Sequence, residues 1–389
     1  MKVKAGWKPY VISSIVAIFL ILVFLEIQAR FKVAHESGKH IDILYEEKFP
    51  LAEKLIADKR KSNGLVYYDY HIFACAPFSS ETMTFTSYYS ARNVPDSMPI
   101  GEGDVTIWIF GGSTMQNMET VDKLTIANQL ALNLKKNNIK ATVVNFGVGG
   151  FQSTLESIKF QDLLRRVDKK ERPDIVVFYD GFNDAGQAFV FEAGTMQEDL
   201  SKKMEALVTG SWGKLAIYST LNFIGKHSYY WKNRLAYKVS TKILFREEII
   251  KNNHDNLLKA VDIYEANTRM ISGICKEFHI NPIFILQPMI YTKKNLTEFE
   301  SKVYNRPNSQ DTINFMNRFY KIARNRMNKY DDFYDMSDAL NGSKRNDFYD
   351  LGHTGPYTGT TTGYKIFEFV KAVLANPSTV SKETAPVCS

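Results

Sequence analysis

The sequence predicts an α/β fold with three layers, α/β/α, around a mostly parallel five-stranded sheet, preceded by one N-terminal transmembrane helix. The first observation behind this prediction is a pattern that begins at Asp104, where short apolar strands alternate with amphipathic helices. Such alternation is typical of a parallel sheet covered on both faces. The second is an uncharged apolar run near the N-terminus, VISSIVAIFLILVFL at residues 11–25, close to the roughly 20 residues that a bilayer span requires.

The apolar run predicts an uncleaved membrane anchor over residues 1–30. Trp7 and Tyr10 lengthen it and are expected at the level of the lipid headgroups. The alternative is a cleaved signal peptide, because three lysines within the first eight residues form a basic leader. However, Ile27 and Ala29 stand where a small-x-small cleavage site is required. Basic residues flank the run on both sides, so charge alone does not set its orientation.

The composition restricts the class of partner. The chain has 389 residues, of which 44% are hydrophobic and 23% charged, an ordinary globular composition. The net charge is +7 and the pI about 9.0, but no Lys/Arg run interleaves with aromatic residues as a nucleic-acid groove would require. We therefore expect no nucleic-acid partner, and a basic surface that favours anionic lipid or acidic glycan. Three cysteines without metal-ligand spacing define no disulfide framework.

Changes in composition divide the rest of the chain. Residues 31–102 combine a charged, helix-like piece with the aromatic stretch GLVYYDYHIFACAPF, and we interpret them as a stalk and packing collar. The α/β domain is expected at 103–375 and a flexible C-terminal tail at 376–389. Residues 186–250, rich in aromatic residues and lysine, interrupt the alternation. Structureless loops of that length are uncommon inside a compact domain, which favours a lid or substrate-facing insertion.

The elements of the α/β domain follow from local apolar patterns. Strands are predicted where short apolar runs occur, and helices where apolar residues recur at helical spacing. The predicted strands are 106–110, 141–146, 174–179, 282–286 and 332–335. The predicted helices are 122–136, 153–167, about 252–278 and about 363–374.

Each of the first three strands ends in a small cluster of glycine and polar residues. The clusters are Gly112-Ser113-Thr114, NFGVGGFQS at 145–153 and DGFND at 180–184. Strand ends on one edge of a parallel sheet are neighbours, so we expect the clusters to meet. The first is either a plain tight turn capped by serine or a turn that exposes a nucleophile. Glycine N–H groups of the second cluster and the Asn183 amide of the third could then stabilise an oxyanion.

A nucleophilic serine needs a base, and His353 is the best candidate among the seven histidines. In FYDLGHTGPYTG, Asp350 precedes His353 by three residues, a spacing that lets the carboxylate reach the imidazole and fix its tautomer. His227, in the insertion, stays an alternative base. Of the others, His35 and His40 lie near the predicted anchor and His71 in the collar, while His254 and His279 are expected to face solvent or to cap a helix.

These blocks, in this order, resemble the SGNH (GDSL-type) hydrolase family, whose fold is flavodoxin-like, over about residues 103–374. The matching motifs are FGGSTM with Ser113, NFGVGG with Gly150, GFND with Asn183, and DLGH with Asp350 and His353. The resemblance implies that Ser113 attacks an acyl carbonyl, that His353 acts as base and then acid, and that Asp350 orients His353. It also implies an oxyanion hole formed by the N–H groups of Ser113 and Gly150 and the side chain of Asn183.

The sequence departs from the family pattern at two places. The first block reads Gly-Gly-Ser in place of Gly-Asp-Ser, and Gly147, Gly149 and Gly150 are all candidate donors to the oxyanion, so Gly150 is assigned by family spacing alone. Met115 occupies the second glycine position of a Gly-x-Ser-x-Gly elbow, which argues against the α/β-hydrolase fold.

The resemblance implies a membrane-anchored serine esterase that cleaves acyl esters, O-acetyl above all, on cell-surface glycan. One alternative is an O-acyltransferase of surface polysaccharide that uses the same acyl-serine, with an integral membrane acyltransferase as candidate partner. Another is a non-catalytic glycan-binding or assembly protein. A single-pass membrane protein with its catalytic domain on the exported side, periplasmic or extracellular, is expected.

Two further pairs of residues lie at the same edge of the sheet. Thr114 and Gln287 are candidate substrate contacts. Asp180 and Asp184 flank Asn183 and could indicate a metal, but hydrogen bonding within their own turn is the preferred interpretation. We therefore expect no metal ion and no other cofactor.

Overall fold

The computed structural model describes residues 8–375 apart from 47–48, 63, 191, 307–308 and most of 194–253. It divides into two compact units, one made of residues 1–39 and 198–248, the other of 40–197 and 249–389. Most of the predicted insertion at 186–250, including His227, lies outside the described residues, as do the first seven residues of the predicted anchor and the predicted tail.

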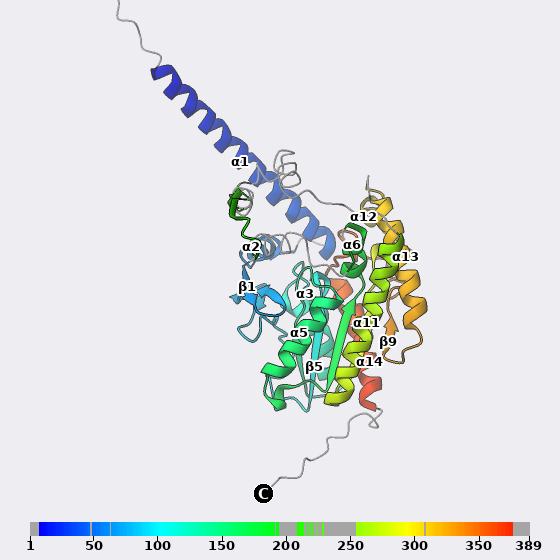
Figure 1. The fold of residues 1–389 in the computed structure, drawn as a ribbon. Coiled ribbons are helices and arrows are strands. Elements are labelled where there is room, and N and C mark those ends of the chain that lie inside the picture. Colours follow the sequence, from blue (N-terminus) through cyan, green and yellow to red (C-terminus); the bar gives the residue numbers. More distant parts are fainter. Residues whose placement is uncertain are drawn as a thin grey trace, which may run out of the picture. The chain divides into compact units, whose positions relative to one another are not determined.

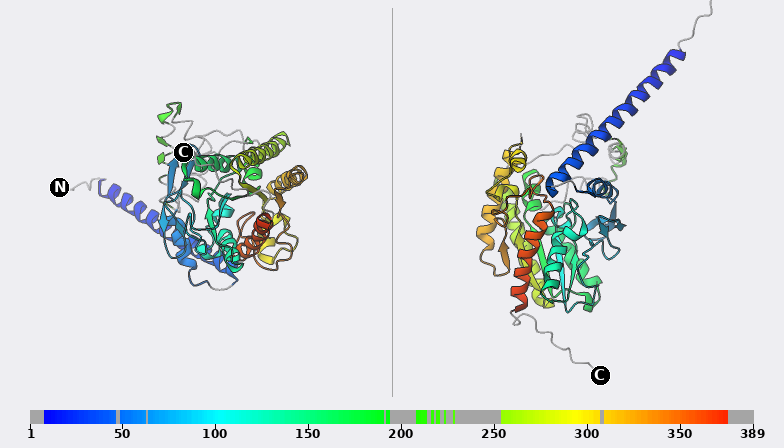
Figure 2. Two further views of the ribbon diagram at one scale, coloured as in Figure 1. Left: turned by 90° about the horizontal axis from the view of Figure 1, so that it is seen from below. Right: turned by 180° about the vertical axis from the view of Figure 1, so that it is seen from behind.

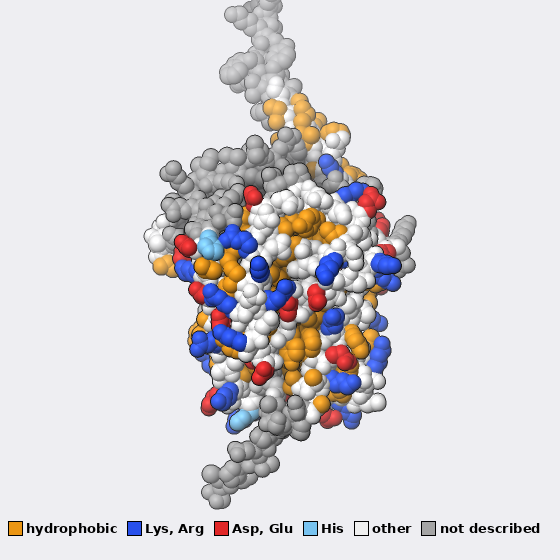
Figure 3. All heavy atoms as spheres, turned by 90° about the vertical axis from the view of Figure 1, so that its right-hand side faces the viewer, with side chains coloured by type: hydrophobic (Ala, Val, Ile, Leu, Met, Phe, Trp, Pro, Cys, Tyr) orange, Lys and Arg blue, Asp and Glu red, His pale blue; other side chains and the backbone are white. Residues whose placement is uncertain are grey.

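The described part of the first unit is dominated by helix α1, Lys8–Tyr45, which continues into the second unit (Figure 1). Every residue from Val16 to Phe24 is exposed, the large apolar side chains by 39% to 63%. Figure 3 shows apolar side chains gathered on this part of the helix. No helix in the described part of the chain meets the length and apolarity needed to cross a membrane.

The second unit is built on a five-stranded sheet whose strands all run parallel. The strand order is β6-β5-β7-β8-β9, in which the first strand of the sheet along the chain lies second from the edge. This is the doubly wound, flavodoxin-like order, and it confirms the predicted sheet. The strands are β5 Val105–Gly111, β6 Ala141–Asn145, β7 Ile175–Asp180, β8 Asn281–Leu286 and β9 Phe333–Asp335.

Helices cover both faces of this sheet (Figure 2). Side chains alternate along each strand, so Trp108 and Phe110 enter the core on one face while Ile107 and Ile109 enter the core on the other. The first face packs against α5 Ser153–Arg166, α6 Phe182–Val190, α11 His254–Phe278 and α13 Gln310–Met327. The second packs against α4 Ile126–Lys136 and α14 Pro356–Ala375.

Helix α14 begins seven residues before the predicted start at residue 363. The reason is a close helix–helix contact. A Cβ atom on Gly359 would lie 2.3 Å from the carbonyl oxygen of Leu124, and one on Gly363 would lie 2.6 Å from Cβ of Gln129. The two glycines argue against a helix by propensity, yet Gly363 lets α14 approach α4 and Gly359 lets it approach the 3-10 turn before α4, Asp122–Leu124.

The predicted collar packs as small pieces of regular structure within the second unit. Helix α2, Ala52–Lys61, precedes an antiparallel hairpin of β1, Leu65–Tyr68, and β2, Ile72–Cys75. The remaining short elements are β3 Phe78–Ser79, β4 Thr84–Phe85, α3 Ser113–Gln116, α12 Glu298–Tyr304 and the 3-10 turns η1 Asp122–Leu124, η2 Lys169–Glu171 and η3 Ile290–Thr292.

Candidate active site

The glycines that end β5 make room for the residues around Ser113. A Cβ atom on Gly112 would lie 2.2 Å from Nδ2 of Asn183 and 3.0 Å from the carbonyl oxygen of Phe151. Ser113 follows as the first residue of the short helix α3. Glycine at position 112 leaves this space free because the loop after β6 and the helix after β7 both approach the backbone there.

Three side chains of the first and last blocks form one continuous hydrogen-bonded chain. His353 Nε2 lies 2.6 Å from Ser113 Oγ, and His353 Nδ1 lies 2.8 Å from Asp350 Oδ2. The other carboxylate oxygen of Asp350 accepts the backbone N–H groups of Gly352 and His353, at 2.9 Å and 2.7 Å. A carboxylate held by its own backbone fixes the orientation of the imidazole, which in turn faces the serine hydroxyl.

Asp350 and His353 lie at the tip of a short hairpin, the catalytic hairpin, that spans residues 347–355. Phe348 pairs with Thr354, and the N–H of Gly355 donates to the carbonyl oxygen of Asp347 at 2.9 Å. The buried carboxylate of Glu300 accepts the N–H groups of Asp347 and Phe348 at 2.9 Å and 3.1 Å. His353 and Asp350 therefore lie on a loop whose first residues are fixed to α12.

Two aromatic rings and a buried carboxylate surround the imidazole. The ring of Tyr349 stacks on His353 with centroids 5.5 Å apart, and Phe182 presents its edge at 6.0 Å. The Tyr349 hydroxyl donates to Oε1 of Glu119 at 2.8 Å, and Lys59 of α2 donates to the same oxygen. Glu119 is only 5% exposed.

This environment raises the pKa of His353 above its ordinary value. Burial by itself lowers that pKa, but the hydrogen bond to Asp350 and the negative charges of Asp350 and Glu119 raise it by more. The charge of Lys59 opposes them. For Asp350 the direction is opposite: burial raises the pKa of the carboxyl, yet the hydrogen bond and charge of His353 and the two backbone N–H donors lower it overall.

The candidate oxyanion donors lie around the serine. Asn183, on α6, donates through Nδ2 to the carbonyl oxygen of Phe151. The N–H of Gly147 donates to Oδ1 of Asn145 at 3.0 Å. By contrast, within the described residues the N–H groups of Ser113, Gly149 and Gly150 donate to no other residue. Of the three glycines that the sequence leaves as candidate oxyanion donors, Gly149 and Gly150 therefore remain.

Gly149 and Gly150 differ in their surroundings. A Cβ atom on Gly149 would come within 3.9 Å of Cβ of Ser113, which places this residue beside the nucleophile. Gly150 has a φ of +82°, and its carbonyl oxygen accepts from Nε2 of Gln187 at 3.1 Å. The left-handed backbone of Gly150 sets the path of the loop past Ser113.

The two candidate substrate contacts, Thr114 and Gln287, are hydrogen-bonded to each other. Thr114 Oγ1 donates to Oε1 of Gln287 at 3.1 Å, and the residues are 3% and 2% exposed. Together they tie α3 to the residue that follows β8, and in this structure neither reaches the surface of the site.

The acidic residues beside Asn183 belong to a buried group. Asp184 accepts the N–H and hydroxyl of Ser153, at 3.2 Å and 2.5 Å. Burial, together with the neighbouring Asp184, raises the pKa of Asp180 to about 8. Among the residues that the structure describes, no group of three or more His, Cys, Asp or Glu is arranged to hold a metal ion.

The other histidines whose side chains the structure describes lie away from Ser113, in positions typical of structural residues. His71 is fully buried, stacks on Tyr68 at 4.4 Å, and has its pKa lowered to about 4, first by burial. His254 Nδ1 lies 2.6 Å from Arg318, and His279 ends α11 with a φ of +56°. In the described part of the chain, only His353 contacts Ser113.

A network that sequence reasoning missed holds the segment after Ser113. The buried guanidinium of Arg92 donates to the carbonyl oxygens of Gln116, Asn117 and Thr120 and pairs with Asp122 at 3.0 Å. Arg92, Lys59 and Glu119 belong to no recognisable sequence motif. Their partners become neighbours only when the collar packs on the sheet. No local signal in the sequence could have identified these residues.

Comparison with known proteins gives similarity in fold only. No family model matches the sequence. No curated protein matches it either. Similar solved structures include an acetyl xylan esterase, at 12% identity over 68% of this chain and 100% of that chain, with a TM-score of 0.39. An acetylxylan esterase from Geobacillus stearothermophilus is similar at 13% identity over 70% and 95%, with a TM-score of 0.38. A psychrotrophic esterase from Pseudoalteromonas sp. is similar at 12% identity over 70% and 100%, with a TM-score of 0.33.

Proposed function

We propose that this protein is a serine hydrolase of the SGNH type that cleaves carboxylic acyl esters. The observation that carries the proposal is the chain of hydrogen bonds from Ser113 Oγ through His353 to Asp350, at 2.6 Å and 2.8 Å. An interaction module has no use for a serine hydroxyl aligned with an imidazole whose other nitrogen is fixed by a carboxylate. Nucleophilic acyl transfer requires this arrangement.

The proposed reaction begins when Ser113 Oγ attacks the ester carbonyl while His353 Nε2 takes the hydroxyl proton. Asp350 holds Nδ1–H of His353 and stabilises the imidazolium that forms. The N–H of Ser113, an N–H of the glycine loop and the amide of Asn183 are the donors for the oxyanion. The imidazolium then protonates the departing alcohol, and water, activated by the same base, releases the acid and restores the serine.

Within this class we propose an O-acetyl ester on a cell-surface glycan as the substrate. The net charge of +7 favours an acidic glycan. Transfer of the acyl group to a sugar hydroxyl is the competing outcome, and trapping the acetylated Ser113 decides between them. Release of acetate to water at an unchanged rate when a sugar acceptor is added supports the hydrolase; acetylation of the sugar supports the transferase.

We further propose that α1 holds the protein at a membrane with the catalytic unit on the exported side. Support comes from the unbroken exposed apolar segment between Val16 and Phe24, which in water would leave a large apolar surface unburied. A C-terminal fusion to a reporter that is active only in the cytoplasm tests the orientation. A strong reporter signal would contradict it, and recovery of the full-length chain in the soluble fraction would contradict the anchor.

Labelling with a fluorophosphonate tests the catalytic proposal directly. We expect the full chain to be labelled and to hydrolyse p-nitrophenyl acetate, and Ser113→Ala to lose both. Ser79→Ala removes an exposed hydroxyl in the collar and is the matched control, expected to behave as the unaltered chain. Undiminished labelling of Ser113→Ala would overturn the proposal.

A further inference from the structure

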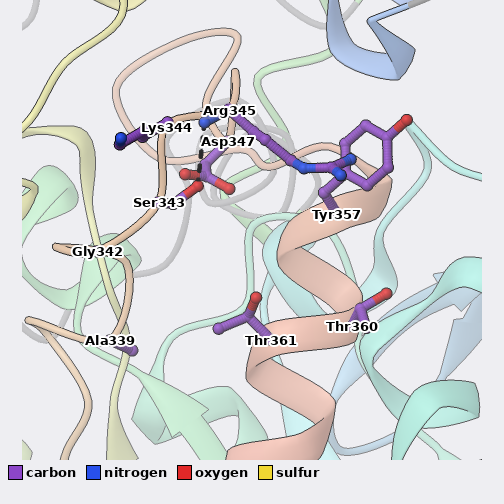
Figure 4. Close-up of a pocket in the computed structure, with 9 residues that line it drawn as sticks. All are labelled: Ala339, Gly342, Ser343, Lys344, Arg345, Asp347, Tyr357, Thr360 and Thr361. Carbon is purple, nitrogen blue, oxygen red and sulfur yellow. Dashed lines mark hydrogen bonds between the residues drawn. The ribbon is translucent and has the colours of Figure 1, made fainter.

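A cavity of about 690 Å³ lies between the segment that leads into the catalytic hairpin and the first turns of α14 (Figure 4). Its volume is in the range of roughly 300–1,000 Å³ that is usual for ligand pockets. Its lining includes three hydroxyl-bearing side chains, Ser343, Thr360 and Thr361, and two cations, Lys344 and Arg345. Ala339, Gly342, Asp347 and the ring of Tyr357 complete it.

One wall of the cavity is a stacked pair. The guanidinium carbon of Arg345 lies 4.0 Å from the centroid of the Tyr357 ring, and Figure 4 shows the two side chains side by side. The Tyr357 hydroxyl donates to the carbonyl oxygen of Tyr45 at 2.8 Å, which holds the ring in place. Glu46 is a loose partner of Arg345, since its Oε2 is 4.0 Å from Nη1. A guanidinium positioned by stacking is suited to bidentate recognition of a carboxylate.

The floor of the cavity is a buried network of three charged side chains. The buried Lys293 pairs with Asp347 and Glu300, both at 2.7 Å, and donates to the carbonyl oxygen of Arg345 at 2.8 Å. Lys293 carries one positive charge against two carboxylates, and all three side chains are buried. The charged group exposed on the wall of the cavity is the guanidinium of Arg345, and this group is what an anion would meet.

The cavity is close to the catalytic hairpin in the chain. Asp347 forms the foot of the hairpin, where its carbonyl oxygen accepts the N–H of Gly355. Tyr357 follows His353 by four residues, and an extended chain spans at most about 3.6 Å per residue, so their Cα atoms are no more than about 14 Å apart. A ring bound here and the ester at Ser113 can belong to one oligosaccharide.

We propose that this cavity is a subsite for an anionic saccharide unit of the substrate, an inference that rests on the proposed esterase function and narrows its substrate to acidic glycan. Arg345 binds the carboxylate of the sugar, and the hydroxyls of Ser343, Thr360 and Thr361 bind its ring hydroxyls. The absence of large aliphatic side chains from the described lining argues against an acyl chain of a lipid.

Binding is measured on the full chain carrying Ser113→Ala, so that no turnover occurs, with hexagalacturonate as the acidic probe and maltohexaose as the neutral one. We expect hexagalacturonate to bind and Arg345→Ala to weaken it at least about tenfold, the loss of one charge-assisted bidentate contact. Arg269→Ala removes an exposed arginine of α11 and is the control expected to change nothing. Glu46→Gln should tighten binding, because it removes the loose carboxylate partner of Arg345.

A second variant and a second assay keep the inference separable from the proposed function. Thr361→Tyr fills the cavity without a change of charge and should also weaken hexagalacturonate. With Ser113 restored, Arg345→Ala should hydrolyse p-nitrophenyl acetate at the unaltered rate, which also verifies its fold. Failure of all forms to hydrolyse this ester would refute the esterase and leave the binding result standing. Equal binding of both probes, or wild-type affinity in Arg345→Ala and Thr361→Tyr, would overturn the subsite.

Discussion

Substitution of Gly112 by alanine is the sharpest test of the proposed oxyanion site, because the structure identifies the side chain that the added methyl group would displace. The added Cβ would lie 2.2 Å from Nδ2 of Asn183, the far end of a flexible side chain, and 3.0 Å from the Phe151 carbonyl oxygen, which is backbone. The side chain gives way more easily than the backbone does. Gly112→Ala should therefore displace the Asn183 amide while the domain stays folded.

The size of the effect follows from the donor that is lost. Removal of one oxyanion donor typically lowers kcat about 10²- to 10³-fold, or about 3–4 kcal/mol. We expect a loss of this size in the hydrolysis of p-nitrophenyl acetate for Gly112→Ala and for Asn183→Ala alike. Fluorophosphonate should still label Ser113 in both variants, although slowly, since the nucleophile and its base are intact.

The double variant distinguishes this reasoning from a general disturbance of the turn. Once Asn183 is alanine, a methyl group on residue 112 no longer meets the amide, so Gly112→Ala/Asn183→Ala should equal Asn183→Ala in kcat/KM. Gly273→Ala, where nothing lies within 4 Å of the added atom, is the control and should retain full activity. Full activity of Gly112→Ala, or losses that multiply in the double variant, would refute the assignment of Asn183 as the displaced donor.

Three other outcomes are expected. Asp350→Asn should fold normally yet lose on the order of 10⁴-fold in kcat, because an amide at this position favours the wrong imidazole tautomer. Circular dichroism checks the fold and ester hydrolysis checks kcat. A loss below tenfold would contradict the prediction. The acidic limb of kcat/KM should lie above the ordinary imidazole pKa, since Asp350 and Glu119 raise the pKa of His353, and Glu119→Gln should move it to lower pH; an unmoved limb would show that Glu119 does not act on the base. Burial raises the pKa of Asp180 to about 8 in the folded state. The folded state therefore holds a proton that the unfolded state releases above pH ~4. As a result, the free energy of unfolding should fall by up to about 1.4 kcal/mol per pH unit between about pH 4 and 8. Thermal unfolding of Asp180→Asn should show a flatter pH dependence, and a slope identical to that of the unaltered chain would count against the buried proton.

The sheet and the order of its polar clusters could be predicted because the relevant information is local. A fully buried parallel strand is a short apolar run, and parallel strands place their carboxyl ends at one edge, so the sequence predicts that Ser113 and Asn183 are neighbours. The structure brings Asn183 against Gly112, as that reasoning requires. Helix α13 was not assigned, although Ile313 and Met316 begin an apolar stripe at helical spacing that could have revealed it.

Contacts between distant segments could not be predicted in the same way. The start of α14 was wrong because Gly359 reads as a helix breaker, while its role is to let two helices touch. Thr114 and Gln287 were correctly placed at one edge, but their mutual hydrogen bond depends on the packing of α3 against the end of β8. The cavity beside Arg345 likewise arises only when α14 folds back on the segment before the catalytic hairpin.

The collar is better understood as part of the candidate active site than as a separate spacer. Lys59 on α2 neutralises the buried Glu119, and Glu119 in turn holds the hydroxyl of Tyr349, whose ring covers His353. Loss of Lys59 would remove the positive charge beside this buried carboxylate and leave the Tyr349 hydroxyl as the remaining side-chain donor to Oε1 of Glu119. Arg92 adds a second tie, from the collar to the three carbonyl oxygens that follow α3. A fragment that begins at the predicted domain boundary, residue 103, lacks both ties, and we expect it to lose the geometry around Ser113 and His353 even where the five-stranded sheet forms.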